Sequence, residues 1–354
     1  MSNLKQFLNS ASNVSKILDD EFKTSKKKLR ILIIQPPSSD AVASYIPHIQ
    51  SNEDISSFGF KPPLGILYLA STLKRDTNHD VKVLDSQVLK YNYKKVVDYA
   101  LEYQPDLIAI SAWTDWWYSA FMTGMLIKKA LPNSKLCYGG PHVSIYPQET
   151  LDLPFVDMVI KGDGEIPIMY LSNLIANNKI SNLVPGLHFK EYGVKEVPND
   201  IFVHPNLDEL PIPDRTLLPI KKYSSVLAKN SFITTMITSR GCPHRCTFCK
   251  LNFQKNIARS AESVINEFKI VESLGISEIE IYDDTFTWSK ERLIQICEGL
   301  IKNKNKILWS VRDRVNKTNI DILKLMYKAG CRRIHYGIES GVQKVIDKMR
   351  KQIK

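Results

Sequence analysis

The chain has 354 residues, of which 48 are Lys or Arg and 37 are Asp or Glu, giving a formal net charge of +11. This length suits about two domains, and no apolar stretch approaches the roughly 18 residues that would indicate a transmembrane helix. The first 30 residues are polar and lysine-rich, so we expect no secretory signal, no disulfides and a cytoplasmic location. The basic residues lack interleaved aromatic residues and predict a solvated surface rather than nucleic-acid binding.

In the first half of the chain, short apolar strands alternate with helices. The predicted strands are residues 30–35, 81–84, 107–111, 135–138 and 158–160. The predicted helices are residues 63–75, 93–103 and 121–131, preceded by an amphipathic helix within residues 3–28. This alternation predicts an α/β fold with a mostly parallel, doubly wound sheet. Ligands bind such sheets beyond the carboxyl ends of the strands, which here are followed by the loops 36–40, 111–116 and 139–142.

A proline-rich segment, residues 176–228, predicts an extended linker with a short strand-like piece at 186–190. A second strand–helix series follows it. Its predicted strands are residues 231–238, 278–282, 307–311 and 333–338. Its predicted helices are residues 261–273, 291–302, 320–329 and 341–354. Such a repeat predicts part of a parallel (β/α) barrel, with its site at the carboxyl ends of the strands.

Three cysteines follow the first strand of this second series: Cys242, Cys246 and Cys249. Their spacing suits a [4Fe–4S] cluster, whose irons are normally held by four cysteine thiolates. Three ligands leave one iron open to a small molecule. The sequence therefore predicts an inorganic site in this loop.

A zinc site formed by the three cysteines and His244 is the alternative. Structural zinc sites usually combine two knuckles that are well separated in sequence. The remaining cysteines, Cys137, Cys297 and Cys331, stand alone. We expect them to be buried as small hydrophobic residues.

The cysteine loop resembles the signature of radical S-adenosylmethionine (SAM) enzymes, Cys-x3-Cys-x-aromatic-Cys. The resemblance implies that a reduced cluster cleaves SAM to methionine and a 5′-deoxyadenosyl radical. It also implies cofactor-binding roles at the ends of the following strands, while no catalytic residue is indicated. The residues concerned are Phe248 beside adenine, Asp283 and Asp284 on the methionine amino group, Arg312 on a carboxylate, and Glu339 and Ser340 on the ribose or methionyl part.

Two of these assignments have structural alternatives. Asp283 and Asp284 could simply cap the helix that follows them. Arg312 could form an ordinary salt bridge with Asp313 or Glu339.

Residues 30–175 resemble the cobalamin (B12)-binding, flavodoxin-like domain that precedes many radical SAM domains. Gly139 and Gly140 correspond to paired glycines, whose missing Cβ atoms let the backbone approach the nucleotide tail of the cofactor. Ser111 corresponds to a serine that follows the third strand. The motif whose histidine coordinates cobalt is absent after the first strand, where residues 36–40 read Pro-Pro-Ser-Ser-Asp. The resemblance thus implies bound cobalamin without a histidine ligand from that loop.

The domains expected from these patterns are an N-terminal helix and basic lead-in (1–29), a cobalamin-binding-like domain (30–175), a linker (176–228) and a radical SAM domain (229–354). The last domain looks truncated, because we count four strand–helix units where the family usually has six. A partner chain could complete the barrel.

The resemblance implies cobalamin-assisted methylation, rearrangement or cyclisation of a small-molecule or peptide substrate. An external donor such as flavodoxin or ferredoxin would supply electrons. A radical SAM enzyme with a vestigial cobalamin domain and a non-catalytic cofactor-binding fragment are the alternatives. Transfer-RNA methylthiolation is disfavoured, because those relatives carry extra N-terminal cysteines and only Cys137 precedes the triad here.

Overall fold

The computed structural model describes residues 27–38, 59–179, 181, 184–192, 197, 201–229, 232–249 and 256–353. The helix expected within residues 3–28 lies almost entirely outside the described residues. The chain divides into two compact units. The second unit contains residues 58–64, 206–209 and 219–354, and the first contains the rest.

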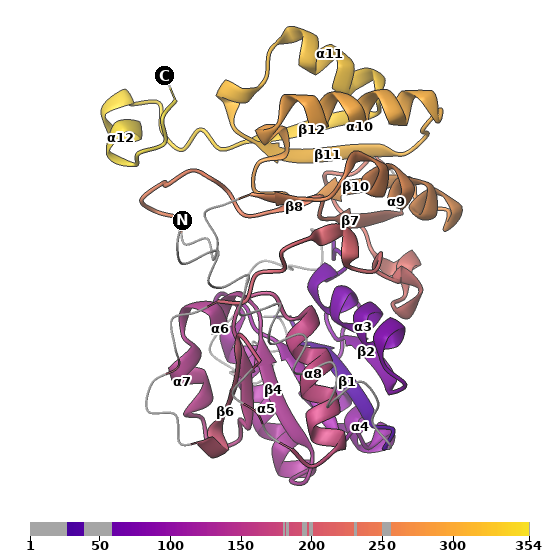
Figure 1. Cartoon of the computed structure of the whole chain (residues 1–354), viewed down its shortest axis with the longest axis vertical. Helices are drawn as coiled ribbons and strands as arrows, with labels where there is room; N and C mark the ends of the chain where they lie inside the picture. Colours follow the sequence, from indigo (N-terminus) through magenta and orange to yellow (C-terminus); the bar gives the residue numbers. More distant parts are fainter. Residues whose placement is uncertain are drawn as a thin grey trace. The chain divides into compact units, whose positions relative to one another are not determined.

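A six-stranded sheet forms the centre of the first unit (Figure 1). Its strands are β1 (Arg30–Gln35), β2 (Asp80–Asp85), β3 (Leu107–Ser111), β4 (Lys135–Gly139), β5 (Met158–Ile160) and β6 (Leu187–Phe189). Their order is β2-β1-β3-β4-β5-β6, with parallel pairing throughout except between β5 and β6. The order of the first five strands is that of flavodoxin-like sheets. The doubly wound sheet expected from the sequence is confirmed.

Helices cover both faces of this sheet, which explains why its inner strands β1 and β3 are almost continuously apolar. They are α3 (Leu64–Asp76), α4 (Tyr93–Tyr103), α5 (Trp117–Ala130), α6 (Pro141–Ile145), α7 (Pro147–Leu151) and α8 (Glu165–Ala176). Ile31 and Ile33 of β1 belong to the core shared with α3 and α8. Leu32 and Ile34 belong to the core shared with α4 and α5.

Three features of the first unit differ from the sequence expectations. Helix α5 begins at Trp117 rather than at residue 121, because Trp117 packs against the core with its ring centroid 5.9 Å from that of Tyr138. Helices α6, α7 and α8 were not expected. Part of the proline-rich segment is not an extended linker, because Leu187 and Phe189 of β6 are buried in the core of this unit.

The second unit contains a four-stranded parallel sheet in the order β12-β11-β10-β7 (Figure 1). The strands are β7 (Ile233–Met236), β10 (Glu278–Ile281), β11 (Leu308–Asp313) and β12 (Cys331–Tyr336), with a separate ribbon of β8 (Ser239–Arg240) and β9 (Ile257–Ala258). The helices between the main strands are α9 (Ala261–Ser273), α10 (Lys290–Lys302) and α11 (Ile320–Lys328). This is the partial (β/α) barrel expected from the sequence.

One face of this sheet is apolar and the other is polar. Ile279 of β10 and Trp309 of β11 pack with the helices in one buried core. Glu278, Glu280 and Ser310 alternate with them and are also buried. Since successive side chains of a strand point to opposite faces, the buried carboxylates line the inner face of the partial barrel.

The final segment differs most from expectation. The helix expected over residues 341–354 is only α12 (Gln343–Lys348). Arg350 and Gln352 have φ values of +52° and +57°, which an α-helix cannot accommodate. The chain after α12 returns instead to the cysteine loop, where the amide of Thr247 donates to the carbonyl of Met349 at 3.0 Å. Within the described part of the chain, no helix is both long and apolar enough to cross a membrane.

Candidate functional site

The three cysteines of the loop line one cavity of about 350 Å³. Its other walls come from the carboxyl ends of β10, β11 and β12 and from the segment after α12. Cys242 is buried, Cys246 is half-buried and Cys249 is exposed. The size is at the lower end of the range for small-molecule sites, about 300–1,000 Å³.

Four of the expected cofactor-binding residues lie together at this cavity, as the resemblance implied. They come from separate parts of the chain: the cysteine loop, the end of β10, β11 and the turn after β12. Of the expected residues besides the cysteines, those that line the cavity are Phe248, Asp284, Arg312 and Glu339. Asp283 and Ser340 do not line it.

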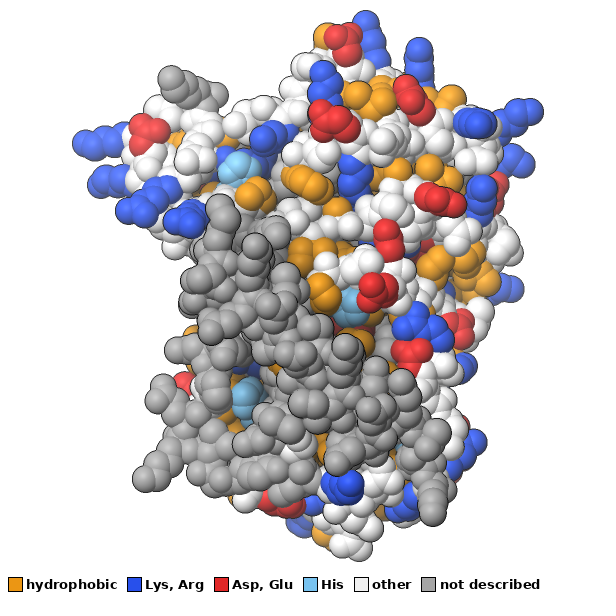
Figure 2. Space-filling view, in the orientation of Figure 1, with side chains coloured by type: hydrophobic (Ala, Val, Ile, Leu, Met, Phe, Trp, Pro, Cys, Tyr) orange, Lys and Arg blue, Asp and Glu red, His pale blue; other side chains and the backbone are white. Residues whose placement is uncertain are grey.

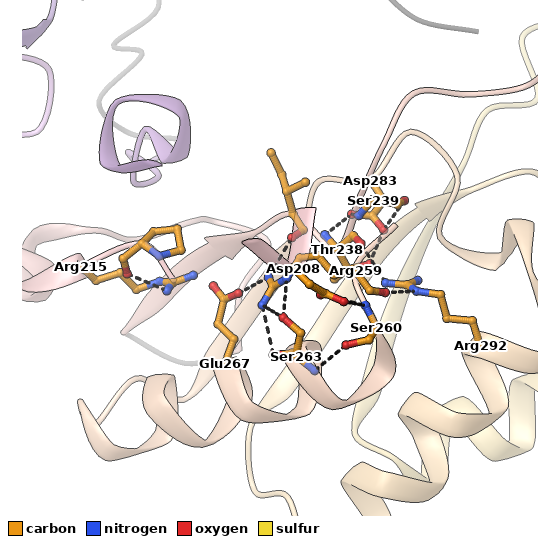
Figure 3. A network of polar contacts seen from close by, with 12 residues as sticks. Asp208, Arg215, Thr238, Ser239, Arg259, Ser260, Ser263, Glu267, Asp283 and Arg292 are labelled. Atoms are coloured by element: carbon orange, nitrogen blue, oxygen red, sulfur yellow. Dashed lines mark hydrogen bonds and ion pairs between the residues drawn. The ribbon is translucent and has the colours of Figure 1, made fainter. Parts of the chain in front are cut away.

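Asp283 lies behind the cysteine loop and is completely buried. One carboxylate oxygen accepts the backbone amides of Thr238 and Ser239 at 2.6 and 3.0 Å. The other accepts the Ser239 hydroxyl at 2.8 Å and the Thr238 hydroxyl (Figure 3). Burial raises the pKa of Asp283, while these hydrogen bonds and the charge of Arg292 oppose that rise. With both oxygens occupied, this side chain holds the turn into the cysteine loop and leaves no acceptor facing the cavity.

Two buried arginines hold the same turn from its other side (Figure 3). The guanidinium of Arg292 donates to the carbonyls of Thr238 and Arg259, at 2.9 and 2.8 Å. Arg259 donates to the carbonyl of Ile237 at 3.1 Å and forms an ion pair with fully buried Glu267. The backbone that enters the cysteine loop is therefore fixed by three charged side chains: Arg259 between β9 and α9, Asp283 after β10, and Arg292 on α10. One sequence signal could have revealed these buried charges. Glu267 is a charged residue on the buried face of the amphipathic helix α9.

Asp284 points the other way from its neighbour. It is exposed, lines the cavity and accepts the amide of Gly241 at 3.1 Å. Gly241 has a φ of +83°, in the region that favours glycine. Asp284 therefore supports the start of the cysteine loop and still presents a carboxylate oxygen to a ligand.

Arg312 lies within β11 rather than after it, and its guanidinium stacks 3.8 Å from the centroid of the Tyr282 ring. Among the described residues it forms no ion pair, so the alternative of a salt bridge to Asp313 or Glu339 is not supported. The carboxylate of Asp313 accepts the amide and hydroxyl of Thr287 instead. An arginine without a carboxylate partner at a cavity is suited to bind an anionic group.

Glu339 and Ser340, which follow β12 in the segment Gly337-Ile-Glu-Ser-Gly341, have two different roles. Glu339 lies in a left-handed backbone conformation with φ of +68° and pairs with the ammonium of Lys351 at 2.7 Å. Ser340 accepts the amide of Val342 at 3.1 Å and so shapes the turn before α12. Phe248 is 54% exposed and lies 5.6 Å from the Lys351 ammonium.

The sequence did not identify several residues of the cavity wall, among them Arg314, His335 and Lys351. His335 pairs in register with Arg312 across β11 and β12, which a residue-by-residue alignment of the strands could have revealed. Burial and the charges of Arg312 and Arg333 lower the pKa of His335. Lys351 comes from the segment after α12, and no local sequence pattern indicated it.

The arrangement of the thiols bears on the zinc alternative. Over residues that the structure describes, no three Cys, His, Asp or Glu side chains are placed to hold a single metal ion. The three cysteines line one shared cavity, where a cluster would take one thiolate at each of three irons.

The candidate cobalamin site lies at the carboxyl edge of the first unit's sheet. Ser111 at the end of β3 is in register with Gly139 at the end of β4. Gly140 has a φ of +101°, and a Cβ there would lie 2.8 Å from the carbonyl oxygen of Ala112. The fold itself thus requires Gly140. A Cβ on Gly139 would meet nothing closer than the Ile160 carbonyl oxygen at 3.6 Å, an ordinary contact, so packing does not itself require glycine there.

Trp117 and His142 belong to the packing beside that edge. Their rings stack with centroids 3.9 Å apart and planes 16° apart. Burial lowers the pKa of His142, which favours its neutral form. Trp113, two residues after the end of β3, has a side chain that is 47% exposed.

Two family models match the chain: the B12 binding domain over residues 55–171 and the radical SAM superfamily over residues 236–354. An uncharacterized methyltransferase of Pyrococcus horikoshii is 33% identical over 91% of this chain and 68% of its own length. The anaerobic magnesium-protoporphyrin IX monomethyl ester cyclase of Rubrivivax gelatinosus is 26% identical over 82% of this chain and 54% of its own. The cytidylyl-2-hydroxyethylphosphonate methyltransferase of Streptomyces wedmorensis is also 26% identical, over 82% and 63%.

Among solved structures, the radical SAM methyltransferase TsrM of Kitasatospora setae has the same fold. The match has a TM-score of 0.69 at 16% identity and covers 90% of this chain and 61% of that one. The chain thus spans less than two thirds of TsrM, of the cyclase and of the phosphonate methyltransferase.

Proposed function

Because the chain belongs to the radical SAM proteins that carry a B12-binding domain, we propose that it cleaves SAM reductively and methylates a substrate with the help of cobalamin. The family expected from the sequence is confirmed. The observation that carries the proposal is the cavity where the three cysteines meet Phe248, Asp284, Arg312 and Glu339.

The residues around the cavity fit a cluster and SAM. Cys242, Cys246 and Cys249 would hold three irons of a [4Fe–4S] cluster. When bound, the cluster supplies the electron for cleavage of SAM to methionine and a 5′-deoxyadenosyl radical. The free carboxylate face of Asp284 would accept hydrogen bonds from the methionine ammonium. The guanidinium of Arg312 would bind the methionine carboxylate through two of its N–H groups.

The first unit would hold cobalamin at its sheet edge. Ser111 and Gly139 lie side by side there, and the missing Cβ of Gly139 would let a nucleotide tail approach the backbone. When bound, cobalamin supplies a methyl group or assists a redox rearrangement. The family's cobalt-coordinating histidine motif is absent directly after β1, since residues 36–40 contain no histidine.

Methylation is the outcome favoured by two of the relatives, and the cyclase relative makes cyclisation the second candidate. The substrate would be a small molecule or peptide in a cytoplasmic setting. Electrons would come from an external donor such as flavodoxin or ferredoxin. A vestigial cobalamin domain or a non-catalytic fragment would be revealed by the experiment below.

The test is formation of 5′-deoxyadenosine from SAM by anaerobically reconstituted protein with dithionite. The expected result is product from the natural chain and none from Cys246→Ala, with most of the iron lost in the variant. Cys137→Ala, which removes a buried thiol of the first unit, is the control and should retain iron and product.

A full cluster without product would favour the non-catalytic fragment. Cobalamin binding is measured by visible absorbance. Formation of 5′-deoxyadenosine by protein that binds no cobalamin would favour the vestigial domain.

A further inference from the structure

Arg314 is a charged side chain that contacts the cysteine triad directly. It follows β11 and is 6% exposed. Its Nη1 donates to the Sγ of Cys246 at 3.7 Å, and its Nη2 donates to the carbonyl of Lys351. Its Nε is buried without a hydrogen-bond partner in the part of the chain that the structure describes. The guanidinium is thus aimed at a cluster ligand and retains unused donor capacity there.

The position of Arg314 is set from both sides. Its backbone amide donates to the carboxylate of Asp313 at 2.7 Å, and that carboxylate also receives two hydrogen bonds from Thr287. On the other side, the segment after α12 is bound to the cysteine loop through the Thr247 amide and the Met349 carbonyl. The guanidinium therefore joins β11, the cysteine loop and the C-terminal segment.

Of the other basic side chains that line the cavity, Arg312 also forms no ion pair among the described residues, but its guanidinium stacks on Tyr282. Figure 2 shows Lys and Arg side chains gathered over α12, on the surface. Lys351 lies at the cavity, but its ammonium is paired with Glu339 at 2.7 Å. Among the described residues, Arg314 forms no ion pair with a carboxylate. Its positive charge is therefore not neutralised where it meets the sulfur.

We propose that Arg314 is a positioning residue that orients the Cys246 thiolate and raises the reduction potential of the cluster held there. Reduction adds one electron from an external one-electron donor to the cluster, with no bond made or broken. Reduction potentials of iron–sulfur clusters depend on net charge, exposure and hydrogen bonds to sulfur. A buried cation that donates to a ligand sulfur stabilises the more negative, reduced state.

The test is a potentiometric titration of the reconstituted full chain, without SAM, in which the reduced cluster is measured by electron paramagnetic resonance. Arg314→Gln removes the charge, and Arg314→Lys keeps it but loses the forked donor geometry. Lys317→Gln removes one positive charge from an exposed residue of the adjacent 3₁₀ helix and serves as the matched control.

We expect the ratio of reduced to oxidised cluster at a fixed solution potential to fall about tenfold in Arg314→Gln, equivalent to about 59 mV for one electron. Arg314→Lys should lie between Arg314→Gln and the natural chain, and Lys317→Gln should differ little from the natural chain. If Arg314→Gln loses its cluster while Lys317→Gln keeps it, the positioning role is supported, and Arg314→Lys then reports the potential.

A full cluster with an unchanged potential in Arg314→Gln would overturn the proposal. So would equal shifts in Arg314→Gln and Lys317→Gln, which would indicate a general effect of charge. The inference rests on the proposed function, but the two can fail separately. Absence of a cluster from the natural chain would refute the function, whereas the comparison between variants tests Arg314 alone.

Discussion

Asp283 provides the sharpest test of the site, because the resemblance and the structure assign it different roles. The resemblance places it on the SAM amino group, whereas the structure places it behind the cysteine loop with four hydrogen bonds from Thr238 and Ser239. We consider Asp283→Ala and Asp283→Asn, with Asp284→Ala as the matched control at the cavity.

The expected loss of stability depends on which hydrogen-bond donors can find another acceptor after the substitution. In Asp283→Ala, the amides of Thr238 and Ser239 lose their acceptor inside a buried region and cannot rotate away. At about 1–3 kcal/mol for each unsatisfied donor, the turn is destabilised by about 2–6 kcal/mol. In Asp283→Asn, the side-chain oxygen can still accept both amides, and the two hydroxyls can rotate to accept from its NH₂ group. The cost is then about 1–3 kcal/mol, for the lost charge.

Hydrogen–deuterium exchange of the peptide that contains residues 233–242 measures this directly, together with iron content after reconstitution. A local loss of about 2 kcal/mol lowers protection about 30-fold. We expect Asp283→Ala to lose protection and most of its iron, Asp283→Asn to retain part of both, and Asp284→Ala to keep its iron but bind SAM more weakly. The reasoning fails if Asp283→Ala retains full protection and full iron while only its SAM affinity falls.

Two further predictions concern the packing around each site. Gly140→Ala should destabilise the first unit by about 1–3 kcal/mol in urea unfolding, because φ is +101° and the new Cβ would lie 2.8 Å from a carbonyl oxygen. Gly139→Ala should leave the stability unchanged but weaken cobalamin binding. Equal stability of the two variants would contradict this prediction. Glu267→Gln should destabilise the second unit by about 3–5 kcal/mol, because it leaves the buried guanidinium of Arg259 without its carboxylate. Thermal unfolding checks this prediction, with the exposed Glu272→Gln on the same helix as the control.

Local patterns in the sequence were sufficient to predict the helices and strands and to identify the cluster ligands. Strand β5 and helices α4 and α9 have the predicted bounds, because apolar periodicity and turn residues act over a few positions. The cysteine spacing is likewise a property of one short loop. The mostly parallel, doubly wound architecture also followed, because alternating strands and helices permit few arrangements.

What the sequence by itself determined, then, was the family, the fold class and the three cysteines. Tertiary structure alone decided which neighbouring side chain faces the cavity. Asp283 and Asp284 are chemically identical, but consecutive residues leave a strand in opposite directions, so one holds the loop and the other meets the cavity. It also decided that Arg314 and Lys351 join the cysteine loop, because contacts between segments far apart in the chain depend on how the strands and the final turn pack, which no local pattern encodes.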